Sequence, residues 1–491
     1  MKPSGELHQL IKNLSMSEKR YFKIFSARHV IAGENNYIRL FDAIEKQEEY
    51  NEQKIKTTFN KEAFVSHLPS EKHYLYNHVL DSLNAFHKDR TFLTRYCNIL
   101  MTIEILYHKG LFDQCKKVIK KAKAEAYSLE KFSILKLIVR WEILVFIKDE
   151  DVKKLYESFD EELRILDVIR LSSVLMRIAF KIQIEMYSGR VSPAFLRERE
   201  EELKLHYPPK KEVNSFWAKY YYHSAKGLIY SIENKASSRL TCYKEINALL
   251  ETNKQFIVDL PHIYNSNNNN LVNLMFAMEK YDKVRPMLNK QRSFIHTYKI
   301  KNATLSKMIF IHTHESELFL HYKLGETAEG VVLIKKIEPE LKKISLLFSP
   351  ALFDLFFMMA VITFCEDDYR SAIKWLNKIL NTEREMNIRI EQRINTRLLY
   401  LIVLYEKEDL FFDNQYQSTK RFLLQEKKHQ GALKILEAIR LIWDGKPSVQ
   451  KKEKLNKLYK KLKSERNKAQ ADSIDKQFDY VEWIESKVKK N

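Results

Sequence analysis

The sequence predicts an all-α protein, and three observations lead to that prediction. Apolar residues recur three and four positions apart along most of the 491-residue chain, which is the spacing of one face of an α-helix. Convincing alternation of apolar and polar residues, the pattern of a half-buried β-strand, does not occur. Only 9 residues are glycine, and tight β-hairpin turns depend on glycine because it adopts positive φ without strain. The predicted fold class is therefore all-α, with many helices.

Short breaks divide the helical pattern into segments. Gly110, Pro261 and Gly325 each fall between two amphipathic stretches and have polar neighbours, as expected of turns. Short turns between long helices predict antiparallel helix pairs. The most apolar stretch, residues 352–364, contains Asp354 and is shorter than the roughly 20 residues that cross a bilayer. We therefore expect a buried core helix there.

One block recurs along the chain: an apolar helix, a short turn, an anchor residue that is usually aromatic, and a second amphipathic helix. The clearest copy, MMAVITFCEDDYRSAIKWLNKIL, covers residues 358–380, and the later anchors lie 42 to 46 residues apart. A recurrence at this distance is typical of helical repeats. The five anchors are Phe112, Tyr281, Thr327, Tyr369 and Phe411.

These blocks resemble the tetratricopeptide repeat (TPR), a helix–turn–helix unit whose copies stack into a right-handed solenoid. The resemblance is clearest over residues 270–425. Ala360 and Ala372 stand where the two helices of a TPR unit approach closely, and Gly330 takes such a position in the preceding copy. Thr327 replaces the usual aromatic residue, and the spacing exceeds the roughly 34 residues of a TPR unit. The resemblance implies a TPR-like α-solenoid of antiparallel helix pairs.

We expect three parts along the chain. Residues 1–90 form an N-terminal helical module or cap, residues 91–445 form the TPR-like α-solenoid, and residues 446–491 form basic C-terminal helices. A cap at each end is expected because the last repeat of a solenoid must cover its apolar face.

The N-terminal module has two interpretations. Its short amphipathic helices either cap the solenoid or form a helix-turn-helix-like module that binds DNA. In the second interpretation the helix over residues 70–87 presents the polar side chains of Lys72, His73, Tyr76 and Asn77.

The chain is strongly basic, with a formal net charge of +20. Such a surplus favours anionic partners such as nucleic acid, but the interpretation that we prefer is a solvated lysine-rich surface that keeps a large protein soluble. Residues 451–468 hold nine basic and two acidic residues. A candidate patch for an anionic partner consists of Lys451, Lys452, Lys454, Lys457, Lys460, Lys461 and Lys463.

The C-terminal helices also carry apolar residues at helical spacing. Leu455, Leu458 and Leu462 form a narrow stripe, which favours a terminal cap with one solvated face. In the last helix, FDYVEWIESKV, four residues are expected to pack back on the protein: Phe478, Val481, Trp483 and Ile484.

The TPR resemblance also implies a binding groove. In TPR proteins the first helices of the units line a concave groove, where asparagine contacts the backbone of a bound peptide. Aromatic side chains add buried area to such a contact. The asparagine run at residues 266–270 has an alternative explanation, in which it reflects the base composition of the genome and has no role in binding. Carried over by register, the candidate partner-binding residues are Asn269, Asn273, Glu315, Phe319, Tyr322, Lys323, Phe357 and Phe364.

The sequence contains no recognisable catalytic constellation. Gly325 and Gly330 have the glycine spacing of a phosphate-binding loop, but the lysine and hydroxyl residue that should follow are replaced by valines. His314, Glu317 and His321 share a helical face, yet the two histidines lie about 10 Å apart along the helix, too far for one zinc ion. We therefore expect no enzyme activity, no cofactor and no metal.

These observations favour a non-enzymatic scaffold that binds a protein or peptide partner in the groove. The alternative is a nucleic-acid-binding or regulatory protein that uses the basic C-terminal helices and the N-terminal module. Four dispersed cysteines without a CxxC pair indicate a reducing compartment. The first 20 residues lack the apolar core of a signal peptide, and we expect a cytoplasmic protein without a transmembrane segment.

Overall fold

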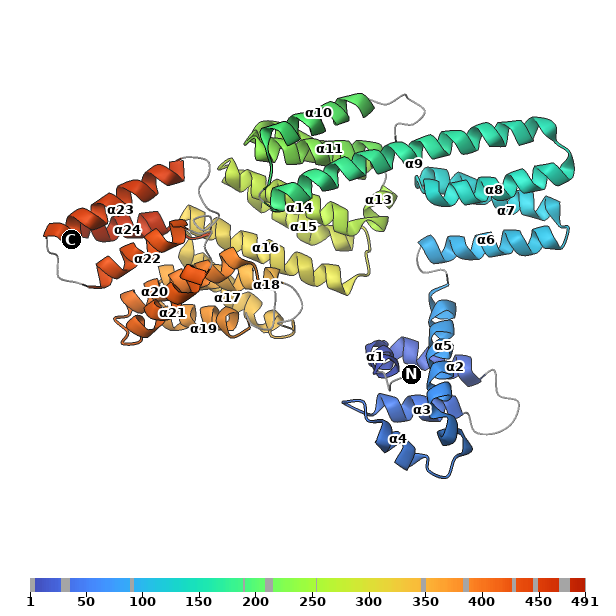
Figure 1. The fold of residues 1–491 in the computed structure, drawn as a ribbon, viewed down its shortest axis with the longest axis horizontal. Helices are drawn as coiled ribbons and strands as arrows, with labels where there is room; N and C mark the ends of the chain where they lie inside the picture. The colour runs from blue at the N-terminus through green and yellow to red at the C-terminus, as the bar shows by residue number, and fades with distance from the viewer. Residues whose placement is uncertain are drawn as a thin grey trace. The chain divides into compact units, whose positions relative to one another are not determined.

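The computed structural model describes eleven stretches of the chain: residues 5–27, 36–88, 92–188, 190–207, 215–252, 254–345, 350–382, 388–425, 430–444, 449–467 and 477–490. These residues form 24 α-helices and one short 3₁₀ helix, with no β-strand among them (Figure 1). The predicted all-α class is confirmed. The chain divides into two compact units, residues 1–169 and 170–491.

The first unit holds nine helices and the beginning of a tenth. Two separate hydrophobic clusters form its cores, one within residues 7–83 and the other within residues 92–169. Its helices are α1 (Glu6–Asn13), α2 (Met16–Ala27), α3 (Asn36–Glu45), α4 (Glu52–Thr58), the 3₁₀ helix η1 (Ala63–His67), α5 (Leu68–His87), α6 (Phe92–His108), α7 (Phe112–Ser128), α8 (Phe132–Asp149) and the first half of α9 (Val152–Tyr187).

The second unit continues from the second half of α9. Its first helices are α10 (Pro193–His206), α11 (Phe216–Ile232), α12 (Ala236–Thr252), α13 (Lys254–Asp259), α14 (Pro261–Ala277) and α15 (Tyr281–Thr297). The remaining helices are α16 (Ala303–Leu324), α17 (Thr327–Leu341), α18 (Ala351–Cys365), α19 (Tyr369–Thr382), α20 (Ile390–Glu406), α21 (Phe412–Gln425), α22 (Gln430–Trp443), α23 (Val449–Asn467) and α24 (Tyr480–Lys490). The boundary between the units falls inside the predicted middle part, and the predicted limits near 90 and 445 stay predictions.

A common turn joins the helices of successive hairpins. In the turn between α18 and α19, Asp367 has φ 56°, and the following amide of Asp368 donates to the carbonyl of Thr363 across 2.9 Å. Gly325 plays the same part between α16 and α17, with φ 71°, where the Glu326 amide donates to the His321 carbonyl. This pattern of a left-handed residue and a 6→1 hydrogen bond satisfies the last carbonyls of the first helix.

The repeat register predicted from the sequence agrees with these turns. Four of the five anchors are the first residues of the second helix of a pair, in α7, α15, α17 and α19. The fifth, Phe411, directly precedes α21. Short connections and shared turn geometry therefore produce the same hairpin at each copy.

The first helices of consecutive hairpins lie in a row. Among the described residues, each of these first helices contacts its neighbours in the row and its own hairpin partner; the row consists of α14, α16, α18, α20 and α22. The close approaches expected from the small residues are present: Ala360 and Ala372 are fully buried. A Cβ atom built on Gly330 of α17 would lie 2.9 Å from a methyl carbon of Ile362 in α18. Any larger residue at position 330 would therefore force the Ile362 side chain to shift.

The core of this row is centred on α18. Every residue from 355 to 363 is buried, and the cluster around them extends from α16 to α24. The prediction of a buried core helix over residues 352–364 is confirmed. Among the described residues, no helix combines the length and apolar character needed to span a membrane.

The C-terminal helices pack on the same cluster. Leu455 and Leu462 of α23 are buried, and α24 contacts α22 and α23. Phe478, Val481, Trp483 and Ile484 are at most 8% exposed, so the prediction that they pack back on the protein is confirmed.

Candidate partner-binding surface

A segment from the end of the described chain, residues 477–490, lies on the row of first helices. We call it the C-terminal segment. It contacts three of those helices, α16, α18 and α20, through the side chains described below, and its helix α24 also packs on α22 and α23. The residues of these helices that contact the segment, which we call the docking face, are Glu315, Tyr322, Asp354, Phe364, Asn395, Tyr405 and Glu406.

Phe478 is the first aromatic contact of the segment. Its ring stacks on Tyr322 of α16 with centroids 6.4 Å apart and an interplanar angle of 20°. It meets Phe364 of α18 edge-on at 5.7 Å. The next amide, that of Asp479, donates to the hydroxyl oxygen of Tyr322 across 3.1 Å. One tyrosine of the docking face thus binds both a side chain and the backbone of the segment.

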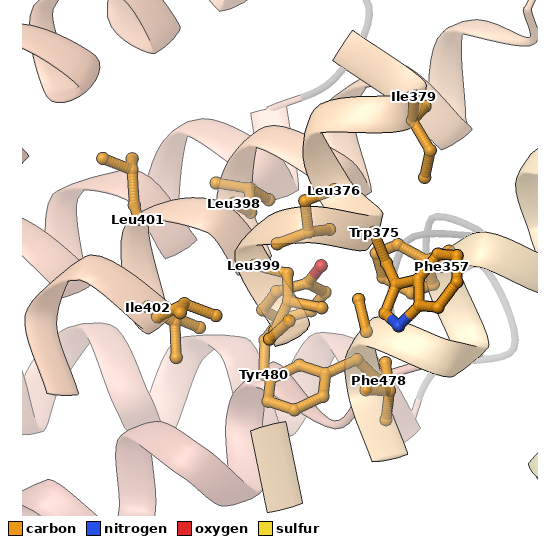
Figure 2. Close-up of a cluster of buried hydrophobic side chains, with 14 of the residues drawn as sticks. Phe357, Trp375, Leu376, Ile379, Leu398, Leu399, Leu401, Ile402, Phe478 and Tyr480 are labelled. Atoms are coloured by element: carbon orange, nitrogen blue, oxygen red, sulfur yellow. The ribbon is translucent and has the colours of Figure 1, made fainter. Parts of the chain in front are cut away.

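Tyr480 enters the core beside Phe478. Its side chain is fully buried, and its hydroxyl donates to the main-chain carbonyl of Asn395 in α20 across 3.0 Å. Figure 2 shows Phe478 and Tyr480 in one cluster with Leu399 of α20 and Phe357 of α18. A tyrosine of this kind combines a large apolar contact with one directional hydrogen bond.

One carboxylate of α20 binds two side chains of the segment's helix, which also packs on α22 and α23. Glu406, at the end of α20, accepts hydrogen bonds from the indole nitrogen of Trp483 at 2.7 Å and from the Lys487 ammonium at 2.6 and 2.8 Å. The Trp483 ring also meets Tyr405 edge-on at 5.6 Å. The helix begins where the carboxylate of Asp479 accepts from the Glu482 amide across 2.9 Å, which is the contact of an N-cap.

Two carboxyl groups lie together at the other end of the docking face. Gln477 hydrogen-bonds with the side chains of both Glu315 and Asp354, and Arg389 donates to both carboxylate oxygens of Asp354 at 2.8 Å. Burial and the nearby Asp354 charge raise the pKa of Glu315 to about 8. Burial also raises the pKa of Asp354, against the opposing effect of Arg389.

The structure brings most of the predicted groove residues of α16 and α18 together. Glu315, Tyr322 and Phe364 contact the C-terminal segment directly. Phe319 stacks edge-on against Phe276 of α14 at 4.8 Å, and the Lys323 ammonium lies 5.3 Å from the Phe319 ring and 5.4 Å from the Tyr322 ring. Phe357 differs from these residues because it is fully buried in the core.

The asparagine run belongs mainly to helix packing. Asn267 donates to the Tyr243 carbonyl at 2.9 Å and to the Asn247 side chain at 2.7 Å. The Asn247 amide in turn donates to Asn268 at 3.0 Å, which joins α12 to α14. These buried side chains are satisfied within the protein, as buried polar groups usually are.

The two asparagines predicted to face the groove lie at the edge of this network. Asn269 is half-buried and accepts from Gln291 of α15, whereas Asn273 is exposed. Asn273 is thus the one of the two whose side chain is open to a partner.

The predicted lysine patch lies on α23. Lys454 pairs with Glu437 at 2.7 Å, and Lys463 donates to the Tyr459 hydroxyl at 2.8 Å. Lys451 is half-buried. The exposed members are Lys452, Lys454, Lys457, Lys460, Lys461 and Lys463. Residue 468, at the end of the basic stretch, lies outside the described residues.

The polar residues predicted for a DNA-binding helix separate into two groups on α5. Lys72 is turned to Glu52, with which it pairs at 2.5 Å, and Tyr76 packs against the cluster of the N-terminal helices. His73 and Asn77 are exposed and hydrogen-bond with each other at 3.1 Å. Both line an open cavity of about 800 Å³ together with Phe25, Tyr37, Tyr74, His78 and Asp81.

The side chains considered as metal ligands have other partners. Glu317 pairs with Arg292, the His314 ring bonds with the Phe310 carbonyl at 2.7 Å, and the His321 ring bonds with Glu326 at 3.0 Å. Burial lowers the pKa of His314 to about 4.

Sequence reasoning missed several residues of this surface, including Asp354 and Tyr405 of the docking face. Tyr480, Asn395, Glu406 and Gln477 form contacts between positions far apart in the chain, and no local pattern marks them. The FDY sequence before the last helix is the one available signal, because it places two aromatic residues around an N-cap aspartate.

No protein-family model matches the chain, and a search of the curated proteins finds no significant relative. The fold and the docking face define an all-α protein of consecutive helical hairpins. Its C-terminal segment contacts α16, α18 and α20 and packs its helix on α22 and α23.

Proposed function

We propose that this chain is a non-enzymatic protein-interaction scaffold of the TPR-like class, whose docking face binds a segment of a partner protein. The observation that supports this proposal is the way the docking face holds the C-terminal segment. Two aromatic residues are buried against the helices, one backbone amide is bound by a side chain, and one carboxylate accepts hydrogen bonds from two side chains of a short helix.

These contacts are the ones by which helical grooves recognise peptides. Aromatic anchors supply buried area, and polar groups of the groove fix the register of the bound segment. The repeat spacing, the anchor positions and the shared turn geometry support the TPR-like class. All four cysteines are free, which supports a reducing location such as the cytoplasm.

Affinity capture by the full chain tests this function. We expect a captured protein to remain bound after nuclease treatment and to be lost from the double variant Tyr322→Ala/Phe364→Ala. The variant Phe411→Ala is the matched control, because Phe411 is 67% exposed and lies outside the docking face. Capture that persists in the double variant, with helical content unchanged by circular dichroism, contradicts the proposal.

Nucleic-acid binding remains the second candidate function, and the exposed lysines of α23 favour it. In that case the triple variant Lys457→Glu/Lys460→Glu/Lys461→Glu should lose binding. The affinity of the wild-type chain should fall steeply with salt, by about one log–log slope unit per neutralised phosphate. Binding through the docking face predicts a weak salt response and no effect of the triple variant.

A further inference from the structure

The C-terminal segment makes its contacts through a compact set of features. It presents an aromatic residue, an aspartate and a second aromatic residue, Phe478–Asp479–Tyr480, at the start of a helix. Trp483 and Lys487 follow on that helix, three and seven positions after Tyr480. These residues meet the docking face through rings, one backbone amide and one carboxylate.

The segment makes polar contacts in addition to the apolar packing of a terminal cap. A cap needs only apolar side chains to cover the last helices of a repeat array. Here the Tyr322 hydroxyl, the Asn395 carbonyl and the Glu406 carboxylate each accept a hydrogen bond from the segment. Directional contacts of this type fix which sequence is bound and in which register.

We infer that the C-terminal segment is an internal ligand of the docking face, and that the partner carries a segment of the same chemistry which replaces it. The partner segment begins a helix with an aromatic residue, an aspartate and a second aromatic residue. Tryptophan and lysine follow at the positions that correspond to Trp483 and Lys487. This inference rests on the proposed function, because it identifies the partner of that same surface.

An internal ligand competes strongly with an external one. A tethered segment acts at an effective concentration in the millimolar range, so the open docking face is a minor state of the wild-type chain. The apparent affinity for an external segment equals the affinity of the open docking face multiplied by the fraction of molecules in which it is open. A substitution that weakens the internal segment, but leaves the docking face intact, must therefore tighten binding of the external one.

The test uses the full chain and a fluorescent synthetic peptide with the sequence of residues 477–490. We expect weak binding to the wild-type chain and about tenfold tighter binding to Trp483→Phe. This variant removes the indole hydrogen bond to Glu406 and reduces the ring that meets Tyr405, and a bond to a charged group alone contributes enough for a change of that size. The substitution keeps an aromatic side chain at this buried position, and circular dichroism checks that the fold is retained.

Two controls make the result specific. Glu482→Gln changes an exposed residue of the same helix and should bind the peptide like the wild type. A peptide with alanine at the positions of Phe478, Tyr480 and Trp483 should not bind any of the chains. Adding Tyr322→Ala to the Trp483→Phe chain should remove the gained affinity.

Two outcomes overturn the inference. The peptide either binds Trp483→Phe no more tightly than the wild type, or gains affinity that does not depend on Tyr322. If this occurs while Tyr322→Ala/Phe364→Ala still abolishes partner capture, the proposed function stands and the partner has a different chemistry. If capture is also unaffected by the double variant, both proposals are wrong and the segment is a structural cap.

Discussion

The hydroxyl of Tyr480 donates a hydrogen bond to the main-chain carbonyl of Asn395 across 3.0 Å, and both residues are buried. The two residues are 85 positions apart. This contact joins the first turn of the last helix to the middle of α20, and thereby fixes the C-terminal segment on the docking face.

Removing that hydroxyl should weaken the attachment without changing the packing. We expect Tyr480→Phe to lower the free energy of unfolding by about 0.5–1.5 kcal/mol, the usual contribution of one hydrogen bond. Urea denaturation followed by circular dichroism measures the effect. Tyr156→Phe is the control, because Tyr156 is 66% exposed and should leave the midpoint unchanged; equal midpoints for both variants and the wild type contradict the assigned contact.

The packing of α17 on α18 can be tested with a single methyl group. Gly330→Ala places a Cβ atom against the buried side chain of Ile362, and overpacking of a core costs about 1–3 kcal/mol. This cost exceeds the gain of about 1 kcal/mol that alanine brings in a helix, so the melting temperature should fall.

Gly227→Ala in α11 serves as the matched control for that substitution. The nearest atom to its added Cβ is a ring carbon of Tyr243 at 3.5 Å, an ordinary contact. The helix propensity of alanine should then raise the melting temperature. A higher melting temperature for Gly330→Ala as well would show that α17 and α18 are less closely packed than described.

The charge of Glu315 should make stability depend on pH. Its pKa is about 8 in the folded chain against an ordinary value of 4.5, so the folded state binds more protons between these values. Stability therefore falls as pH rises through that window. His314, whose pKa is lowered from 6.5 to about 4, has the opposite effect below pH 6.5.

The range from pH 6.5 to 8 thus avoids the effect of His314 and reports on Glu315 together with its neighbour Asp354, whose pKa burial also raises. We expect the melting temperature of the wild-type chain to fall across this range. The free energy of unfolding should fall by at most about 1.4 kcal/mol per pH unit for one proton. Glu315→Gln should flatten the profile. An identical slope in the variant would assign the pH dependence to other groups.

The buried and exposed asparagines should respond differently to substitution. Asn267→Ala leaves the Asn247 side chain without one of its partners, and an unsatisfied buried polar group costs about 1–3 kcal/mol. Asn273→Ala should leave stability unchanged because its side chain is exposed. Thermal denaturation compares the two variants, and equal losses would contradict the assignment of the run to helix packing.

The hairpins could be predicted because their signals are local. Apolar spacing identifies each helix, and the anchors mark where the second helix begins, since turn and helix start lie within a few residues. The packing of Trp483 and Ile484 was predictable for the same reason, because they fall on one apolar stripe of a helix. Tyr480 was missed because it lies at the start of α24, where the stripe is too short to define a face.

The docking face itself depends on contacts that no local pattern contains. Tyr322 and Asp479 are 157 positions apart, and the sequence holds no feature that pairs them. Three of the groove residues inferred from the TPR register, Glu315, Tyr322 and Phe364, contact the C-terminal segment. The segment that contacts them, however, comes from far along the chain and could not be predicted from local sequence. The asparagine run shows the same limit, because its hydrogen-bond partners come from α12 and α15.

Hydrogen–deuterium exchange of the full chain tests the central claim most directly. Backbone amides of residues 477–490 and of α16, α18 and α20 are compared in Trp483→Phe with and without the peptide of residues 477–490. Our account predicts that bound peptide releases the chain's own segment, so its amides exchange faster while the three helices stay protected. Unchanged protection of residues 477–490 at saturating peptide would contradict it, because the peptide would then bind elsewhere.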